Sequence, residues 1–470
     1  MGFGNDARDP RLHGTEIADS LVDLIGNTPI VKLGRLGADL PCPLVAKLET
    51  TNPGGSSKDR PALEMILAAE ASGELKPGGT IVEPTSGNTG VGLAIVAAQR
   101  GYRCVFVTTN KVVPERVDLL RAYGAEVVVC DVAVAPEDPN SYYSTAERLV
   151  KERPDAYRPN QYANPNNALA HEKTTGPEIW RQTSGRVTHF VAGAGTCGTI
   201  TGVGRYLKSM NPAVKVIAAD PDNSVFSGGS GRPYLIEGVG EDFFPAAFDR
   251  ALYDEIVACS DAEAYLMARR AANEEALLLG SSGGLAVAAA LKLKDRLTPD
   301  DMVVVLIPDS GRGYLSRVYN DDWMAGYGFI QDCDDCVRAA IEHRGPEALA
   351  LLYVNPTQTV REAIDLMRAN GVSQLPVCKN TPPFAVAEVA GSVDELVLMN
   401  AVFNDPSVMD MPVNDVMGPR LPTVGIGQKL SRAVAILETA PALLVLSGGR
   451  PVSILTRTDI LRSLAVRTRG

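Results

Sequence analysis

Short runs of β-branched residues alternate with helical patterns from Pro43 to Ile307, and this alternation restricts the fold more than any other feature. The runs are apolar along their whole length, which is typical of strands that helices cover on both faces. We therefore expect an α/β fold with parallel sheets, in which ligands bind beyond the carboxyl ends of the strands. The pattern predicts strands over 43–49, 80–83, 103–108, 126–130, 187–192, 214–219 and 302–308, and helices over 58–72, 88–100, 114–123, 198–210 and 283–293.

The composition changes after Trp323, and an approximate internal repeat follows. In each copy a proline-containing turn leads into a helical pattern and then a short strand, first over 356–377 and again over 422–446. Because each copy is too small to bury its apolar face alone, the two copies are expected to pack as a pair. The sequence thus predicts a catalytic region over 1–328, a linker over 329–349, and two small domains over 350–405 and 412–468.

The net charge and the N-terminal sequence indicate which kinds of partner and which cellular compartment to expect. A formal net charge of −11 argues against a nucleic-acid or anionic-membrane partner. No uncharged apolar run approaches the roughly 20 residues that cross a bilayer. The first 20 residues lack the features of a secretory signal, and the eight cysteines are scattered through apolar segments. We therefore expect a cytoplasmic protein with reduced thiols.

Cys333 and Cys336, with His343 nearby, form a single Cys-x-x-Cys pair. A lone pair of this kind is weak support for zinc or redox chemistry. We favour the interpretation as a solvated linker, and we predict no metal site.

Four loops carry residues suited to chemistry. The first, Asn52–Arg60, brings Lys58 to a helix N-terminus, where the positive end of the helix dipole lowers the pKa of an amine. The deprotonated amine is the form that attacks a carbonyl to give a Schiff base. A surface lysine at an ordinary helix start is the alternative that this motif alone leaves open.

The other three loops combine glycines with polar side chains at helix starts. Glu83–Gly90 offers hydroxyls, a side-chain amide and backbone N–H groups, which suit a carboxylate but also ordinary helix capping. Gly193–Thr199 offers N–H groups and two hydroxyls to a phosphate, without a Walker lysine or the glycine spacing of a dinucleotide loop. Gly280–Gly284 opens another helix.

In their order along the chain, the four loops resemble those of the fold-type II PLP enzymes, the cysteine synthase and cystathionine β-synthase family. The resemblance covers nearly the whole chain. It implies an α/β fold-type II catalytic region of two parallel-sheet subdomains, followed by a tandem pair of CBS domains (a Bateman module). The expected cofactor is pyridoxal 5′-phosphate (PLP).

The resemblance also implies a role for individual residues. Lys58 matches the Schiff-base lysine, Asn88 the asparagine that bonds the ring hydroxyl oxygen of PLP, and Ser282 the serine that faces the pyridine nitrogen. The phosphate loop corresponds to Gly195, Thr196, Cys197, Gly198 and Thr199. The residues expected to grip the substrate carboxylate are Thr85, Ser86, Thr89 and Gln161.

Two of these positions have chemical consequences. Cys197 stands where most members of the family have glycine, so its side chain must point away from the phosphate. Ser282 leaves the pyridine nitrogen neutral, whereas an aspartate would protonate it and make the ring a strong electron sink. Loss of a β-substituent as the Cα proton departs is then the favoured route, and a thiol can attack the product.

Two longer segments, Ser227–Gly240 and Leu306–Met324, resemble cystathionine β-synthases in particular. They imply a lyase of transsulfuration and cysteine biosynthesis that condenses serine with homocysteine. In that reaction Lys58 takes the Cα proton and water leaves the β-carbon. Cysteine in place of serine would release hydrogen sulfide. Members of the family are dimers or tetramers, so a homo-oligomer is expected.

Two other functions stay open at this point. A cysteine synthase that uses O-acetylserine and sulfide shares every catalytic loop, and only the longer segments and the tail separate it from the first choice. A nucleotide-sensing regulatory protein with an inactive PLP region is a candidate from another class, and the intact Lys58 argues against it.

The C-terminal repeat is expected to bind S-adenosylmethionine or an adenine nucleotide and to regulate the enzyme. Thr456 and Asp459 match the family's ribose-binding positions, and Gln374 lies in the corresponding region of the first copy. A helix cap at Asp459 is the alternative. The segment Gly391–Glu395 keeps the pattern poorly, so one adenosyl site per pair is expected.

Haem is not expected. Haem-containing synthases of the family carry a Cys and a His in an extra N-terminal segment. Here only His13 precedes Cys42.

Overall fold

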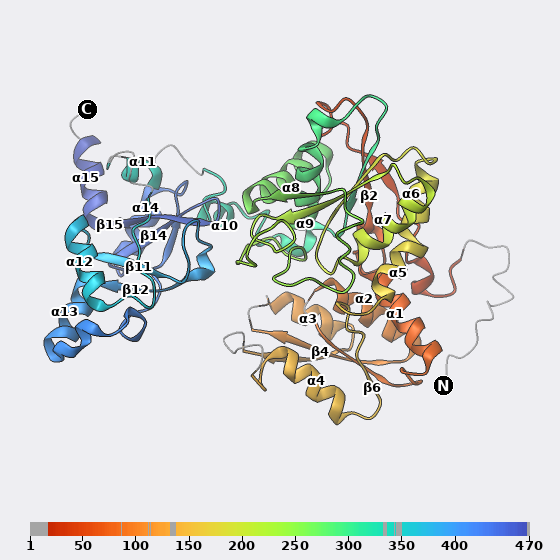
Figure 1. Cartoon of the computed structure of the whole chain (residues 1–470), viewed down its shortest axis with the longest axis horizontal. Coiled ribbons are helices and arrows are strands. Elements are labelled where there is room, and N and C mark those ends of the chain that lie inside the picture. The colour runs from red at the N-terminus through yellow and green to blue at the C-terminus, as the bar shows by residue number, and fades with distance from the viewer. Residues whose placement is uncertain are drawn as a thin grey trace. The chain divides into compact units, whose positions relative to one another are not determined.

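The computed structural model describes residues 17–85, 87–110, 112, 114–131, 138–331, 336–342, 344 and 350–467. The chain divides into two units, which are coloured by residue number in Figure 1. The first unit comprises Met1–Gly231 and Ile236–Gly313, and the second comprises Arg232–Leu235 and Tyr314–Gly470. The predicted α/β class is confirmed, since sheets and helices are combined in each unit.

The larger sheet of the first unit has six strands in the order β1-β2-β10-β7-β8-β9. Its strand β1 runs antiparallel to β2, and the other neighbours run parallel. The central strand β10 is buried at all five of its residues, which explains its unbroken run of Val, Leu and Ile. In sheet order the strands are Ile30–Lys32, Leu44–Leu48, Val303–Ile307, His189–Gly193, Lys215–Pro221 and Glu255–Cys259.

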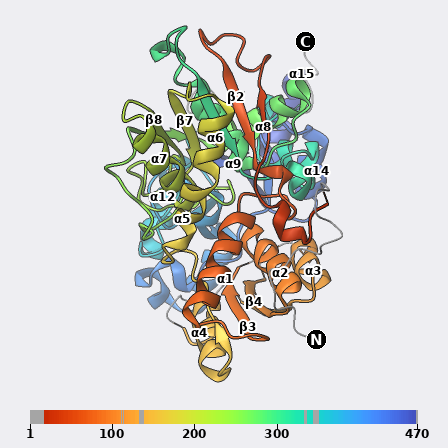
Figure 2. The ribbon, with the colours of Figure 1, turned by 90° about the vertical axis from the view of Figure 1, so that its right-hand side faces the viewer.

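The smaller sheet of the first unit is parallel throughout, in the order β5-β4-β3-β6. Helices cover both of its faces, because Ile81 packs in the cluster formed with α1 and α2 whereas Val82 packs in the cluster formed with α4. Figure 2 shows α1 and α2 beside β3 and β4. In sheet order the strands are Glu126–Cys130, Arg103–Thr109, Thr80–Pro84 and Ala156–Tyr157.

Four helices of the first unit begin at the loops that the sequence singles out. Helices α1, α2, α7 and α9 follow the four motif loops, and the predicted bounds of α2 and α7 agree with the structure. The nine helices described in this unit are α1 Asp59–Ser72, α2 Asn88–Arg100, α3 Pro114–Ala122, α4 Tyr142–Glu152, α5 Asn166–Lys173, α6 Thr175–Gln182, α7 Gly198–Met210, α8 Asp261–Glu275 and α9 Ser281–Leu291.

The second unit contains the repeat, and each copy has its own sheet. In the first copy β11 pairs antiparallel with β12, and in the second β14 pairs parallel with β13 and antiparallel with β15. These strands are β11 Gln374–Cys378, β12 Val389–Asp394, β13 Thr423–Gly425, β14 Ala442–Ser447 and β15 Arg450–Thr456. The helices of this unit are α10 Asp321–Gly326, α11 Val337–Glu342, α12 Val360–Asn370, α13 Glu395–Asn404, α14 Leu430–Leu437 and α15 Arg457–Arg467.

The predicted linker over 329–349 needs correction over part of its length. Residues Val337–Glu342 form α11, and Val337, Ala340 and Ile341 are buried with the core of the second repeat copy. The segment is short and its flanks are charged, so three apolar residues at helical spacing gave no clear signal. Cys336 is also buried, whereas Cys333 and His343 lie outside the described residues.

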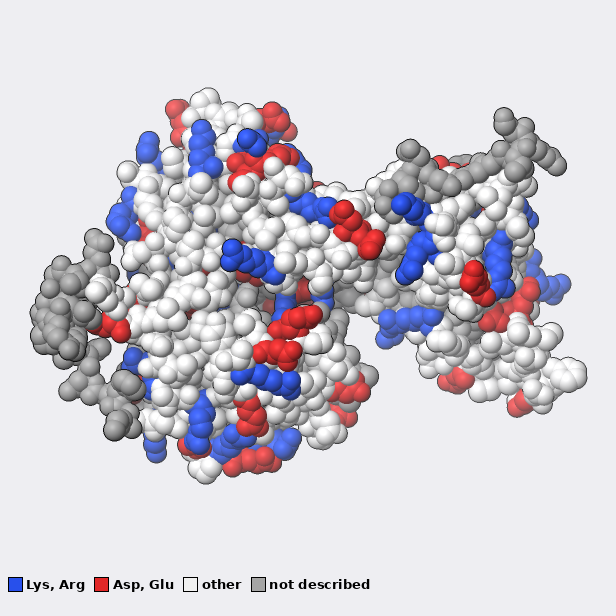
Figure 3. Space-filling view, turned by 180° about the vertical axis from the view of Figure 1, so that it is seen from behind, with Lys and Arg blue, Asp and Glu red and all other residues white. Residues whose placement is uncertain are grey.

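Charged side chains of both signs are interspersed on the face of the molecule shown in Figure 3. Over the described residues, the helices are all too short or too polar to cross a bilayer.

Four charged side chains are buried together in the first unit, where β2, α1 and α6 meet. Arg60 contacts Glu49 and Glu178, each at 2.7 Å, and Lys47 contacts Glu178 at 2.6 Å. Burial alone raises the pKa of Glu178, but hydrogen bonds from Arg60 and Lys47 outweigh it and lower that pKa to about 2. The charges therefore compensate one another away from water.

Replacing Glu178 by Ala leaves two buried cations short of a partner, and we expect the free energy of unfolding to fall by about 3–5 kcal/mol at pH 7. Urea unfolding, monitored by intrinsic fluorescence, measures this free energy. Because the folded pKa of about 2 lies below the ordinary 4.5, the contribution of Glu178 is present above pH 4.5 and is lost as pH falls towards 2.

The matched control is Glu64→Ala, which removes an ion pair with Lys173 at the surface. We expect this control to cost at most about 1 kcal/mol. Equal losses in the two variants would contradict the interpretation.

Candidate functional site

Lys58 lies directly before α1, as its N-cap residue, and its backbone N–H donates to Ser56 Oγ at 3.2 Å. Removal from water lowers the pKa of its ammonium group, and the negative charges of Asp309 and Glu241 partly oppose that change. The direction is the one that the sequence predicts, but burial rather than the helix dipole is its main cause. The deprotonated amine that a Schiff base needs is thus favoured at this position.

Asp309 joins three of the loops. It directly follows Pro308 at the carboxyl end of β10, and its Oδ2 accepts from Asn88 Nδ2 at 2.8 Å. Its backbone oxygen accepts from Gly280 N–H, which precedes α9, at 3.4 Å. Pro308 O accepts from Ser57 N–H at 2.8 Å, next to Lys58. Sequence reasoning did not assign Asp309 a role, although a carboxylate directly after an apolar strand could have signalled one.

The predicted phosphate loop opens α7. Cys197 adopts φ +62° and is 2% exposed, and its Sγ donates to Gly195 O at 3.3 Å. Its side chain therefore points into the core, as the departure from glycine requires. A Cβ on Gly195 would lie 2.7 Å from Gly238 O, so the close approach of the two loops needs glycine there.

The two hydroxyls of this loop are held by buried side chains of α5. Thr196 Oγ1 accepts from Asn167 Nδ2 at 3.0 Å, and Thr199 Oγ1 pairs with His171 Nε2 at 3.1 Å. A Cβ on Gly198 would overlap the Asn167 side chain. Since the first N–H groups of a helix have no intrahelical partner, the α7 N-terminus suits an anion such as a phosphate.

His171 is fully buried between two threonines, with Nδ1 2.9 Å from Thr175 Oγ1. Burial, together with the nearby charges of Arg60 and Lys58, lowers the pKa of His171 well below its usual value. The ring is therefore neutral and holds Thr199 by hydrogen bonding rather than by charge. Sequence reasoning missed Asn167 and His171, because neither lies in a glycine loop.

The predicted carboxylate-binding residues come together in part. Thr89 Oγ1 donates to Gln161 Oε1 at 2.7 Å, and Thr85 is buried at the end of β3. The buried carboxylate of Glu83 accepts from the backbone N–H of Asn160 at 2.9 Å and of Gln161 at 3.1 Å. Glu83 thus fixes the turn that presents Gln161. Ser86 lies outside the described residues.

One network now connects the loops. Asn167 Nδ2 donates both to Gln161 O, at 2.8 Å, and to Thr196, so the predicted carboxylate-binding loop and the predicted phosphate loop share a partner. Thr89 adjoins Asn88, which reaches Asp309. Ser282 lies in the first turn of α9 and is 4% exposed.

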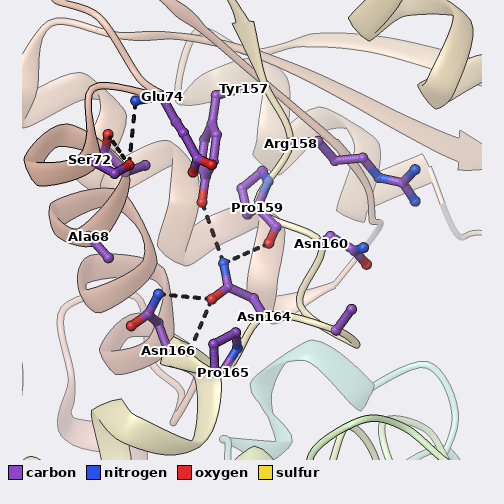
Figure 4. A pocket seen from close by; sticks show the side chains of 12 residues that line it. Ala68, Ser72, Glu74, Tyr157, Arg158, Pro159, Asn160, Asn164, Pro165 and Asn166 are labelled. Carbon is purple, nitrogen blue, oxygen red and sulfur yellow. Dashed lines mark hydrogen bonds between the residues drawn. The ribbon is translucent and has the colours of Figure 1, made fainter.

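A separate pocket of about 380 Å³ lies behind the Gln161 loop, and Figure 4 shows its lining. At its centre, Asn164 Nδ2 donates to Pro159 O at 2.9 Å, and Asn164 Oδ1 accepts from the backbone and side chain of Asn166, each at 3.0 Å. Gln161 does not line this pocket. The pocket therefore belongs to the scaffold that holds the loop.

In the second unit, the Asp459 carboxylate turns back to Thr456 at the start of α15. Asp459 Oδ2 accepts from the Thr456 N–H at 2.8 Å and from the Thr456 hydroxyl at 2.7 Å. Thr456 is therefore the N-cap of α15, and Asp459 is the third helical residue of a capping box rather than the N-cap itself. Gln374 begins β11, and its Oε1 is buried without a hydrogen-bond partner among the described residues.

No cluster of His, Cys, Asp and Glu with the geometry of a metal site occurs among the described residues. His13 lies outside them.

Two family models match the chain. The description of the first is "Pyridoxal-phosphate dependent enzyme", and it covers residues 21–309. The second is the CBS domain, over 349–382 and 413–466.

Curated relatives called cystathionine beta-synthase match most of the chain. The rat protein is 42% identical over 77% of this chain and 66% of its own length, so the chain spans about two thirds of that relative. The Dictyostelium discoideum protein is 34% identical over 95% of this chain and 92% of its own. The Saccharomyces cerevisiae protein is 33% identical over 95% of this chain and 98% of its own length.

Two solved structures match the catalytic part. An O-ureido-L-serine synthase gives a TM-score of 0.62 at 39% identity, and covers 65% of this chain and 96% of its own. A hydrogen sulfide-producing enzyme from Fusobacterium nucleatum gives a TM-score of 0.61 at 37% identity, and the match covers 64% of this chain and 98% of that enzyme.

Replacing Asp309 by Asn removes a negative charge that raises the pKa of the Lys58 ammonium. Lys58 should therefore lose its proton at a lower pH in this variant than in the wild type. The pH dependence of Lys58 acetylation in the ligand-free protein, read by peptide mapping, measures this midpoint. Asp249→Asn, which alters a partly exposed carboxylate paired with Arg205, should leave it in place. A midpoint that rises in Asp309→Asn would contradict the assignment.

Proposed function

The chain belongs to the pyridoxal-phosphate-dependent enzymes, and from this we propose that it replaces the β-hydroxyl of serine with the thiol of homocysteine to give cystathionine. The observation that carries the proposal is the desolvated amine of Lys58, joined through Asp309 and Asn88 to the other loops. Relatives called cystathionine beta-synthase that span nearly the whole chain support the choice of substrates.

The residues present fit PLP. Gly195 and Gly198 leave no room for a Cβ, and Thr196 and Thr199 stand at the α7 N-terminus, which suits the phosphate. The nearby amine is Lys58, which suits the aldehyde. When bound, PLP supplies an electrophilic carbon for the amine and a ring that withdraws electrons from the substrate Cα.

Different residues of the chain bind the substrate, transfer the Cα proton and contact the cofactor. Thr85, Thr89 and Gln161, with Ser86, bind the substrate carboxylate and orient the Cα–H bond. Lys58 accepts the Cα proton at Nζ, and returns it after the thiol has bonded to the β-carbon. Asn88, whose amide is held in place by Asp309, would bind the ring hydroxyl oxygen of PLP. Ser282 would bind the ring nitrogen and would leave it neutral.

Serine plus homocysteine, and O-acetylserine plus sulfide, should be given separately to the purified enzyme. We expect cystathionine from the first pair. Turnover with the second pair alone would overturn the proposal in favour of a cysteine synthase. The solved relatives are named for an O-ureido-L-serine product and for hydrogen sulfide production, so more than one pair of substrates has to be tested.

The same preparation tests Lys58. Borohydride reduction followed by peptide mapping should place the pyridoxyl label on Lys58, and Lys58→Ala should lose the label and at least about 10³-fold in turnover. A variant that kept its PLP absorbance and turnover would remove the mechanism. An active wild type also excludes a purely nucleotide-sensing protein.

We further propose that S-adenosylmethionine or an adenine nucleotide binds the second unit at Thr456, Asp459 and Gln374 and regulates turnover. The matching CBS domains support a ligand of this type. The buried, unpartnered Oε1 of Gln374 supports a polar ligand.

Glu362 offers a matched control for Asp459, because it has the same position in the capping box of α12 and accepts from Thr359 N–H at 2.7 Å. If Asp459 binds the ligand, Asp459→Asn should weaken S-adenosylmethionine binding at least tenfold by calorimetry, whereas Glu362→Gln should not. If both variants lower the melting temperature and keep the affinity, Asp459 acts in the capping box alone.

A homo-oligomer in the cytoplasm completes the proposal. Leu396, Met399 and Phe403 of α13 are 59–87% exposed, and apolar residues gathered in this way support association with a further chain. The seven described cysteines are free thiols, which supports a reducing compartment.

A further inference from the structure

Glu241 is a carboxyl group in the first unit to which the proposed reaction gives no role. Its backbone is held firmly: its N–H donates to Ser224 Oγ at 3.1 Å, and its carbonyl accepts from Val225 N–H at 3.0 Å. The preceding residue, Gly240, donates its N–H to Ala194 O at 2.6 Å. Ala194 adjoins the phosphate loop, so Glu241 is fixed beside that loop.

The side chain of Glu241 lies among the residues of the site. It forms a hydrogen bond with Tyr162, and Tyr162 directly follows Gln161. Its charge acts on Lys58 and on Cys197 of the phosphate loop. The charge of this carboxyl group thus acts on the amine and on the phosphate loop, and its hydrogen bond joins it to the residue after the predicted carboxylate-binding Gln161.

Tyr162 is held independently of Glu241. Its carbonyl accepts from Ala246 N–H at 3.1 Å, and its ring packs edge-on against Phe243 with the centroids 5.3 Å apart. The hydroxyl that Glu241 uses is therefore presented by a fixed ring.

The surroundings keep Glu241 near its protonation midpoint at neutral pH. Burial raises the pKa of Glu241 to about 7; the hydrogen bond from Tyr162 and the charge of Lys58 lower it, and the charges of Asp242 and Asp220 raise it. A group with this pKa can both give and take a proton at physiological pH.

The reaction has a step that needs such a group. Lys58 takes the proton from Cα, and the Cβ–Oγ bond of serine then breaks with its electron pair on oxygen. That oxygen needs a proton to leave as water, and in the second half of the reaction the incoming thiol has a proton to lose. Among the residues assigned so far, only Lys58 could protonate the leaving oxygen, and it would have to give up the proton that it has just taken from Cα.

We propose that Glu241 protonates the departing hydroxyl of serine and regains its proton from the thiol that attacks the β-carbon. Water takes the Glu241 proton, the thiol proton restores the carboxyl group, and Lys58 returns its proton to Cα. The protons balance over one turnover. This inference rests on the proposed function.

The test compares two leaving groups in Glu241→Gln, which keeps the shape of the side chain. The change in cofactor absorbance on mixing with amino acid alone follows the first half-reaction. With serine we expect the rate to fall by at least about 100-fold. With β-chloroalanine, whose chloride leaves without a proton, we expect it to stay within about fivefold of the wild type.

The pH profile gives a second readout. In the wild type, the rate with serine should fall as pH rises through about 7, because the proton donor is lost, whereas the rate with β-chloroalanine should lack that fall. Burial raises the pKa of Asp59 to about 7 as well, so the infrared readout is the difference between the wild-type holoenzyme and Glu241→Gln. One carboxyl band that titrates near pH 7 should be missing from the variant, and the Asp59 band should be present in both proteins.

The second half-reaction has its own signature. The rate of the homocysteine step should be lower in Glu241→Gln than in the wild type, and this difference should shrink as pH rises towards the pKa of the thiol. Near that pH the thiolate forms without a base. A difference that stays constant with pH would contradict the second part of the proposal.

Two further variants guard against a structural effect. Asp249→Asn removes a carboxylate from the same connection between β8 and β9 and should keep the wild-type ratio of serine to β-chloroalanine rates. Tyr162→Phe keeps the ring and removes the hydrogen bond that lowers the pKa of Glu241, so the fall of the serine rate with rising pH should move to higher pH, whereas the β-chloroalanine rate should not change. It carries the test if Glu241→Gln does not fold.

The proposal is overturned if Glu241→Gln slows serine and β-chloroalanine equally, since Glu241 would then only position the site. It is also overturned if neither rate changes, since the ammonium of Lys58 would then supply the proton. A wild-type enzyme that is inactive with serine but active with O-acetylserine would instead sink the proposed function.

Discussion

The hydrogen bond from Asn88 to the buried carboxylate of Asp309 is the interaction on which the site depends. Asp309 follows the central strand of the larger sheet by two residues, and Asn88 begins the helix after a strand of the smaller sheet. A single side chain thus ties the two sheets together at their carboxyl ends. The same carboxylate sets part of the field at Lys58, so the geometry and the electrostatics of the amine have a common origin.

Much of the fold is predictable because its strands and helices carry their own signal. Helices α2 and α7 have the predicted bounds, since each begins at a glycine-rich loop and continues as an apolar periodic run. Strands β1 and β6 were missed because they have only three and two residues and depend on pairing with a neighbour. Helix α11 was missed because its apolar face matters only once the second repeat copy packs on it.

The site is predictable at its glycine loops and not at the side chains that support them. Asp309 and Asn88 are 221 residues apart in the sequence, and Asn167 and Thr196 are 29 apart, so no local pattern relates them. Buried partners such as His171 and Glu83 act through tertiary contacts that only the fold creates. The lowered pKa of Lys58 is foreseeable in direction, but its main cause is burial, which the helix position alone does not reveal.

The buried charge cluster has a mechanical consequence for the amine. Arg60 follows Lys58 by two residues, and its buried guanidinium forms ion pairs with Glu49 and Glu178. Shifting the first turn of α1 would separate opposite charges in a medium of low polarity, so this turn is stiff. We therefore expect motions that admit substrate to occur in other parts of the scaffold, with the backbone of Lys58 held in place.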